Sequence, residues 1–197
     1  MRPVGSWPIV STKPQQLVSP PLSDDPLYYK GRKVPLRIHF DGVYWLFRWP
    51  ALKPPPGAAV AYGTPDETGF SSTDSTPLLM EAHETLPGRI DLLSCRRVEV
   101  AVRNADRYPG TVTVELILTN STTPAETALS LGQVKAATTL RLPAPDNRPN
   151  EETLSFPVPE YPAIASFDGV TVRFHLQSDR ETLSPRMAID NLLLVPR

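Results

Sequence analysis

The stretch from Arg97 to Asn120, RVEVAVRNADRYPGTVTVELILTN, predicts two β-strands joined by a polar turn. In the first half, every second residue is a valine, and in the second half every second residue is valine or leucine. Successive side chains of a strand point to opposite faces, so each series predicts one buried face. Pro109 and Gly110 between the two halves favour a turn. We therefore expect an antiparallel hairpin in the core, whose buried residues are Val98, Val100, Val102, Val112, Val114, Leu116 and Leu118.

Similar alternation continues through the rest of the chain. Apolar and β-branched residues recur at period two, and turn formers separate these segments, which is typical of strands. No segment has the pattern of a helix of three turns. About ten strands predict an all-β fold, a two-sheet antiparallel β-sandwich of the jelly-roll kind. In such folds the first and last strands often pair, so we expect Val34–Phe40 beside Ala188–Val195.

Proline is unusually frequent, with 24 residues among 197. Many of these prolines lie in residues 1–33, which show no sustained period and predict an extended arm or linker. Trp7, Tyr28 and Tyr29 are the expected docking points if this arm packs against the domain. Residues 34–197 then form a single β-sandwich domain, a size that suits one core.

The segment VPLRIHFDGVYWLFRW, residues 34–49, predicts a second hairpin. Asp41-Gly42 between two alternating runs favours a two-residue type I′ turn, which pairs Phe40 with Val43. This register places one face toward the core: Leu36, Ile38, Phe40, Val43, Trp45, Phe47 and Trp49. The other face carries Arg37, His39, Tyr44, Leu46 and Arg48.

That second face is the main candidate binding surface. It combines guanidinium groups, an imidazole and an aromatic ring, and ligand sites in general combine apolar area with a few fixed polar groups. Arg173 and His175 extend the surface if their strand is a neighbour. The candidate ligand-binding residues are Arg37, His39, Tyr44, Arg48, Arg173 and His175. The alternative is an ordinary solvated face without a ligand.

Composition excludes some partners. The formal net charge is −1, from 20 basic and 21 acidic residues, so the clustered surplus of Lys and Arg that nucleic acid requires is absent. Cys95 is the only cysteine, and we expect a buried structural thiol. The sequence contains no run of about 18 apolar residues, so it predicts no transmembrane helix. The first residues do not resemble a signal peptide. Localisation stays open, with an extracytoplasmic site favoured over a cytoplasmic one.

Signals for catalysis and for metals are weak. Glu81 and His83 are expected on one strand face, a pair that is common by chance, and zinc needs three or four converging ligands. Glu99 and Glu115 are the only pair of strand carboxylates that we consider for glycoside cleavage. No G-x-S-x-G motif is present. We therefore expect a protein without catalytic residues and without a cofactor, and calcium is the one metal that acidic loops would suit.

The C-terminal segment AIDNLLLVPR, residues 188–197, resembles the closing strand of jelly-roll carbohydrate-binding modules and galactose-binding-like domains. The resemblance implies a calcium-holding role for Asp190, although Arg37 and His39 stand where such families carry acidic residues in the first strand. It also implies a non-catalytic binding or accessory module whose ligand is carbohydrate. The alternative is a structural or protein-interaction domain of a larger or membrane-anchored assembly.

Overall fold

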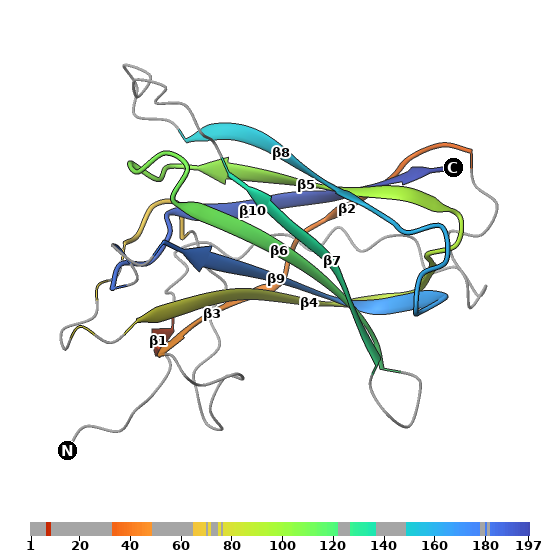
Figure 1. The fold of residues 1–197 in the computed structure, drawn as a ribbon, viewed down its shortest axis with the longest axis horizontal. Coiled ribbons are helices and arrows are strands. Elements are labelled where there is room, and N and C mark those ends of the chain that lie inside the picture. Colours follow the sequence, from red (N-terminus) through yellow and green to blue (C-terminus); the bar gives the residue numbers. More distant parts are fainter. Residues whose placement is uncertain are drawn as a thin grey trace.

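Two antiparallel β-sheets packed face to face form the protein (Figure 1). The computed structural model describes the backbone of Trp7–Pro8 and residues 33–48, 65–69, 71, 75, 77–121, 127–136, 149–177, 180 and 182–197. Within these residues there is no α-helix, and hence none long and apolar enough to cross a membrane. The predicted all-β sandwich is confirmed.

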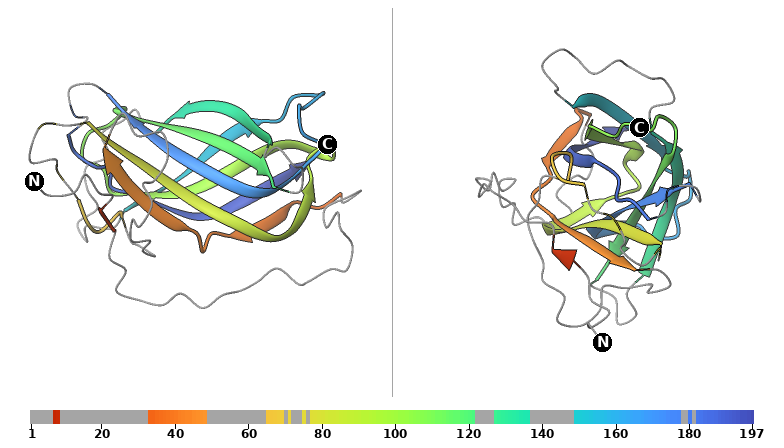
Figure 2. Two further views of the ribbon diagram at one scale, coloured as in Figure 1. Left: turned by 90° about the horizontal axis from the view of Figure 1, so that it is seen from below. Right: turned by 90° about the vertical axis from the view of Figure 1, so that its left-hand side faces the viewer.

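The larger sheet has six strands in the order β1-β3-β4-β9-β6-β7, and the smaller has four in the order β2-β10-β5-β8. All neighbouring strands are antiparallel, and seen along the strands the two sheets enclose one core (Figure 2). The strands of the larger sheet are β1 (Trp7–Pro8), β3 (Val43–Arg48), β4 (Leu78–Asp91), β9 (Ser166–Leu176), β6 (Val112–Asn120) and β7 (Thr127–Lys135). Those of the smaller sheet are β2 (Leu36–His39), β10 (Met187–Pro196), β5 (Cys95–Asn104) and β8 (Asn150–Pro157).

The core lies between the sheets and contains both apolar series of the stretch from Arg97 to Asn120. Val100 and Leu116 are fully buried, and their neighbours at every second position are at most 2% exposed. The predicted faces of β5 and β6 are thus confirmed, but the predicted hairpin is wrong. Strand β5 pairs with β10 and β8, whereas β6 pairs with β9 and β7. The loop between them crosses from one sheet to the other, a distance of about 10 Å in β-sandwiches.

The hairpin predicted around Asp41-Gly42 is also wrong. Strand β2 pairs with β10, and β3 pairs with β4 and β1. Gly42 lacks the positive φ that a type I′ turn needs. A Cβ atom at this position would instead collide with the carbonyl oxygen of His83 and the ring of Phe40, so glycine is required for close packing. The dipeptide forms a corner between the sheets.

This corner reverses the predicted faces of β3. Leu36, Ile38 and Phe40 are buried as expected, but on β3 it is Tyr44 and Leu46 that belong to the core cluster. The opposite face of β3 carries the half-buried Val43 and Trp45 together with the buried Phe47, and Trp49 lies outside the described residues.

The first and last strands of the domain are neighbours, as predicted. Leu192 of β10 lies opposite Ile38 of β2, and Asn191 lies opposite His39. Trp7 lies opposite Leu46, so this part of residues 1–33 joins the edge of the larger sheet. The other proposed docking points, Tyr28 and Tyr29, lie outside the described residues.

A buried ion pair connects the loop after β5 to the loop after β9, and the single thiol is also buried. The Arg180 guanidinium donates to both carboxylate oxygens of Asp106, at 2.7 and 2.9 Å, and stacks on the Tyr108 ring with 4.6 Å to its centroid. Cys95 is fully buried, and burial raises the pKa of its thiol to about 12. The predicted structural thiol is confirmed.

Candidate functional site

Four of the six predicted binding residues lie on two opposite outer faces of the sandwich. Arg37 and His39 belong to β2 in the four-stranded sheet, whereas Arg173 and His175 belong to β9 in the six-stranded sheet. Strand β9 is not a neighbour of β2, so Arg173 and His175 do not extend the surface that carries Arg37 and His39. Arg48 ends β3 in the six-stranded sheet, and its side chain lies outside the described residues.

Tyr44 is not on a surface, which corrects its prediction as a ligand-binding residue. Only 3% of Tyr44 is exposed, and its ring packs edge-on against Phe40 with centroids 5.7 Å apart. Its hydroxyl oxygen accepts a hydrogen bond of 2.7 Å from the backbone N–H of Ile189. Burial raises the pKa of this hydroxyl well above its usual range. The side chain therefore supports β10 from inside the core.

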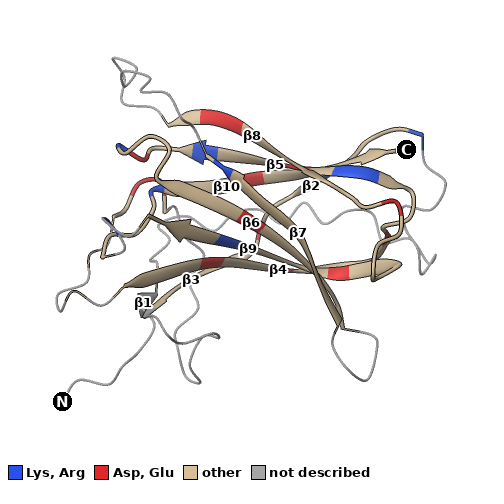
Figure 3. Cartoon of the chain, viewed as in Figure 1, with Lys and Arg blue, Asp and Glu red and all other residues tan. Residues whose placement is uncertain are grey.

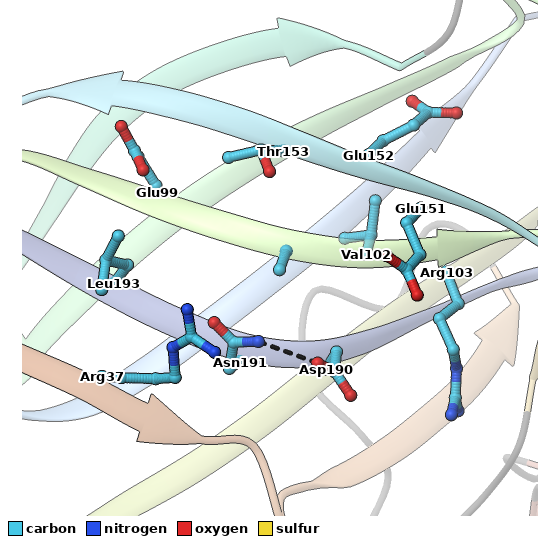
Figure 4. Close-up of a pocket in the computed structure, with 11 residues that line it drawn as sticks. Arg37, Glu99, Val102, Arg103, Glu151, Glu152, Thr153, Asp190, Asn191 and Leu193 are labelled. Carbon is cyan, nitrogen blue, oxygen red and sulfur yellow. Dashed lines mark hydrogen bonds between the residues drawn. The ribbon is translucent and has the colours of Figure 1, made fainter.

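A polar groove with a volume of about 430 Å³ lies on the outer face of the four-stranded sheet (Figure 4). It crosses all four strands of the sheet. The lining residues are Arg37 of β2, Asp190, Asn191 and Leu193 of β10, Glu99, Ala101, Val102 and Arg103 of β5, and Glu151, Glu152 and Thr153 of β8. We call this surface the groove.

Cross-strand register explains why the groove is hollow. Asn191, Ala101 and Thr153 lie opposite one another on β10, β5 and β8. Ala101 is the smallest of the three, so the middle of this row is low while longer side chains rise around it. A β-bulge between Ile189 and Asn191 leaves Asp190 exposed at the groove. Bulges bend a strand and redirect its side chains.

Several charged groups of the groove are already paired. Glu99 accepts from Arg97 Nε at 2.6 Å, and the side-chain amide of Asn191 donates to Asp190 at 2.8 Å. Arg103 Nε lies 3.2 Å from Asp66 Oδ2.

Three other groove side chains lack a partner among the described residues. Within the described part of the chain, Arg37, Glu151 and Thr153 have no hydrogen bond or ion pair from their side chains. Arg37 points toward Asn191, while Glu151 lies nearer to Arg103 (Figure 4). Among the described residues, the groove thus offers a free guanidinium group from β2, and a free carboxylate and a free hydroxyl group from β8.

Among the described residues, Asp190 is not part of a cluster of metal-ligating side chains. Calcium takes six to eight oxygen ligands, and no group of three or more His, Cys, Asp or Glu side chains within the described ranges is arranged to hold a metal ion. Calcium binding at Asp190 stays a prediction.

The outer face of the six-stranded sheet carries a different arrangement. Glu81 of β4, Arg173 of β9 and Glu115 of β6 lie opposite one another across three strands. In Figure 3 a basic segment of β9 lies between acidic segments of β4 and β6. Arg173 Nε donates to Glu81 at 2.6 Å, and its Nη1 lies 3.5 Å from Glu115. His83 and His175 complete what we call the charged row, each within 2.9 Å of one of the two carboxylates.

The side chains of the charged row form hydrogen bonds with one another. Burial would raise the pKa of Glu81, but hydrogen bonds from His83 and Arg173 outweigh it and hold that pKa below its usual range. Glu115 behaves in the same way, because His175 and Ser130 both contact its carboxylate and Arg173 lies nearby. Both carboxylates are therefore charged near neutral pH and already in contact with donors.

Sequence reasoning found only part of these two faces. The pairing of Glu81 with His83 on one strand face was predicted and is confirmed, with 2.8 Å between Oε2 and Nε2. The proposed carboxylate pair is wrong, because Glu99 and Glu115 belong to different sheets and lie on opposite outer faces. Asn191, Thr153 and Glu151 were not predicted as groove residues, because their proximity depends on which strands pair.

No protein-family model matches this chain, and no curated protein is significantly similar to it. The resemblance of residues 188–197 to carbohydrate-binding modules therefore stays a prediction, and the groove has to be interpreted from its own chemistry.

Proposed function

We propose that this protein is a non-catalytic binding module that takes a carbohydrate ligand in the groove. The observation that carries the proposal is a hollowed sheet face with polar side chains, above all Arg37, that have no partner among the described residues. Polar groups that are solvated in the free protein can exchange water for ligand hydroxyl groups without breaking an internal bond.

The chemistry of the groove suits a ligand rich in hydroxyl groups. Arg37 supplies donors, Glu151 supplies acceptors, and the Thr153 hydroxyl supplies both. These side chains project from β2 and β8 of one sheet, so their spacing is fixed by the backbone ladder rather than by a loop. Leu193 and Ala101 add apolar area between the polar groups. None of the described residues that line the groove is aromatic, so these residues would recognise a ligand by hydrogen bonds rather than by stacking.

A glycan array compares the intact protein with two groove variants, Arg37→Ala and Thr153→Ala. We expect Arg37→Ala to weaken binding about tenfold or more, because hydrogen bonds that involve a charged group contribute about 1.5–3 kcal/mol. The matched control is Arg96→Ala, which removes an exposed arginine of β5 outside the groove. If the intact protein binds no glycan, the carbohydrate proposal is wrong. If binding survives both groove variants, the ligand does not occupy the groove.

A second candidate function is a structural or protein-interaction domain of a larger assembly. Strand β1 supports it, because Trp7–Pro8 adds to the edge of β3 and extends the six-stranded sheet. Extended segments of partners bind exposed sheet edges in the same way. A stable complex that forms with the whole chain and is lost when residues 1–33 are deleted would favour this function over carbohydrate binding.

A further inference from the structure

The corner between the two sheets places two carboxyl groups together. Asp41 lies in this corner, and its backbone N–H donates to the side chain of Glu84 on β4. Oδ1 of Asp41 and Oε2 of Glu84 are both buried, and neither has a hydrogen-bond partner among the described residues. Buried oxygens without a donor are rare in proteins because they lose their bonds to water.

A proton shared between the two oxygens would give each of them a hydrogen-bond partner. Two neighbouring carboxylates repel each other, whereas a carboxylic acid donates a strong hydrogen bond to a carboxylate beside it. We propose that Asp41 and Glu84 share a proton, and that this carboxyl pair is a pH-sensitive latch that closes the corner between β2 and β3. Loss of the proton leaves two negative charges at the corner and opens the latch.

The electrostatics of Glu84 support the pair. Burial, and to a smaller degree the charge of Asp41, raise the pKa of Glu84 to about 7 even though the Asp41 N–H acts in the other direction. With this pKa, the Glu84 carboxyl group loses its proton in the pH range found in cells.

The groups around the pair leave Asp41 as the main partner of Glu84. From β2, His39 Nε2 lies 3.6 Å from Asp41 Oδ1. From β3, the Tyr44 hydroxyl is buried and bound to Ile189. Residue Val170 of β9 lies opposite Glu84, and Asp168 on that strand is held by Ser121. Among the described residues, the other charged groups on these elements are Glu81, His83, Arg173 and His175 of the charged row, Arg37 and Asp190 at the groove, Asp91, which accepts from the Leu93 N–H, and Arg89 near the end of β4.

One backbone hydrogen bond connects the corner to the groove. The backbone N–H of Phe40, next to Asp41, donates to the carbonyl oxygen of Asp190 at 3.1 Å. Asp190 is the bulge residue at the groove, and its carboxylate accepts from Asn191. A displaced corner would therefore strain the bond that holds the bulge in place. This effect on the groove rests on the proposed function, whereas the shared proton does not.

Nuclear magnetic resonance tests the latch without any ligand. The first measurement is the titration of the Glu84 side-chain carboxyl carbon in the intact protein and in Asp41→Asn. We expect a midpoint near the pKa of about 7 in the intact protein and a lower midpoint in Asp41→Asn. The second measurement is the hydrogen-exchange protection of the Phe40 amide, corrected for the intrinsic effect of pH. Protection should fall about tenfold for each unit of pH above the midpoint while opening is coupled to loss of the proton.

Two variants decide the interpretation. Glu84→Gln keeps a donor for Asp41 and cannot ionise, so protection of the Phe40 amide should not change with pH. Glu160→Gln is the control, because Glu160 is exposed in a loop outside the corner. A Glu84 midpoint in the range of exposed glutamates overturns the proposal, as does an equal midpoint in Asp41→Asn, which would mean that burial alone raises it. A loss of Phe40 protection that persists in Glu84→Gln also overturns the latch. Since none of these measurements uses a glycan, failure of the latch is distinct from failure of carbohydrate binding.

Discussion

The two outer faces of the sandwich use the same residue types differently. On the four-stranded sheet, Arg37 has no ion pair among the described residues, whereas on the six-stranded sheet Arg173 lies between the carboxylates of Glu81 and Glu115. A charge that is paired inside the protein holds strands together, and a charge that faces only water is available to a ligand. On this contrast we expect the charged row to contribute to stability, and the groove is where we propose that a ligand binds.

Replacing one arginine on each face tests this contrast most directly. Arg173→Met should lower the free energy of unfolding by about 2 to 3 kcal/mol, because it removes the cation that lies between the carboxylates of Glu81 and Glu115. Glu81 would suffer most, since only 3% of its side chain is exposed. Arg37→Met should change the free energy of unfolding by less than about 0.5 kcal/mol. Urea denaturation of both variants measures the difference, and equal losses would contradict the division between the faces.

Tyr44→Phe tests whether the core supports the groove from below. The variant removes the oxygen that accepts from the Ile189 N–H, next to the bulge of β10. A buried N–H without a partner should lower the free energy of unfolding by about 1.5 kcal/mol. Tyr161→Phe is the control, because Tyr161 is 87% exposed. If both variants melt at the temperature of the intact protein, the Tyr44 hydroxyl does not hold the bulge.

The pH dependence of stability should have two limbs with different origins. The pKa values of Glu81 and Glu115 are below their usual range, so the stability that they contribute is present above the pKa of the unfolded carboxyl groups, about 4.3, and is lost as the pH falls below it. The pKa of Glu84 is raised to about 7. The stability that protonated Glu84 contributes is therefore complete below about pH 4 and is lost as the pH rises to about 7. Stability should therefore be greatest in weakly acidic solution.

One variant should flatten each limb. Thermal melts as a function of pH should show that Arg173→Met weakens the acid limb, because the carboxylates of the charged row lose their donor. Glu84→Gln should remove the neutral limb, worth about 1 kcal/mol after allowance for solvent around the half-buried side chain. A neutral limb that is unchanged in Glu84→Gln would exclude this glutamate as its cause.

Period-two alternation predicted the buried faces of β5, β6 and β2 correctly, because burial of one face is a local property of a strand. It did not predict which strands pair. The Asp41-Gly42 dipeptide signals a change of direction, and the same change serves a hairpin or a corner between sheets. Because the dipeptide forms a corner, the faces of β3 are the reverse of those predicted. Tyr44 therefore lies in the core instead of on the predicted surface.

The groove was only partly predictable for the same reason. Arg37 and Asp190 were noticed for their own chemistry, but Thr153 lies near them only because β10 and β5 stand between β2 and β8. The charged row likewise joins three strands that are distant in the sequence. Single residues can suggest chemistry, whereas a site that crosses a sheet depends on long-range strand order.

The smallest expected effect on stability comes from the Arg97–Glu99 ion pair, which has the same residue types as the ion pairs of the charged row. Glu99→Gln removes one member of the Arg97–Glu99 ion pair, and this should change the free energy of unfolding by less than about 0.5 kcal/mol because the Arg97 side chain is 35% exposed. Glu115→Gln on the other face should have a larger effect, since it disturbs contacts with Arg173, His175 and Ser130 together. Raising the salt concentration should abolish the small effect of Glu99→Gln and reduce that of Glu115→Gln only partly, because buried charges are screened less than exposed ones. If Glu99→Gln proves as costly as Glu115→Gln, the groove face also depends on its charges for stability, and the free groups around Arg37 would no longer be sufficient reason to place a ligand there.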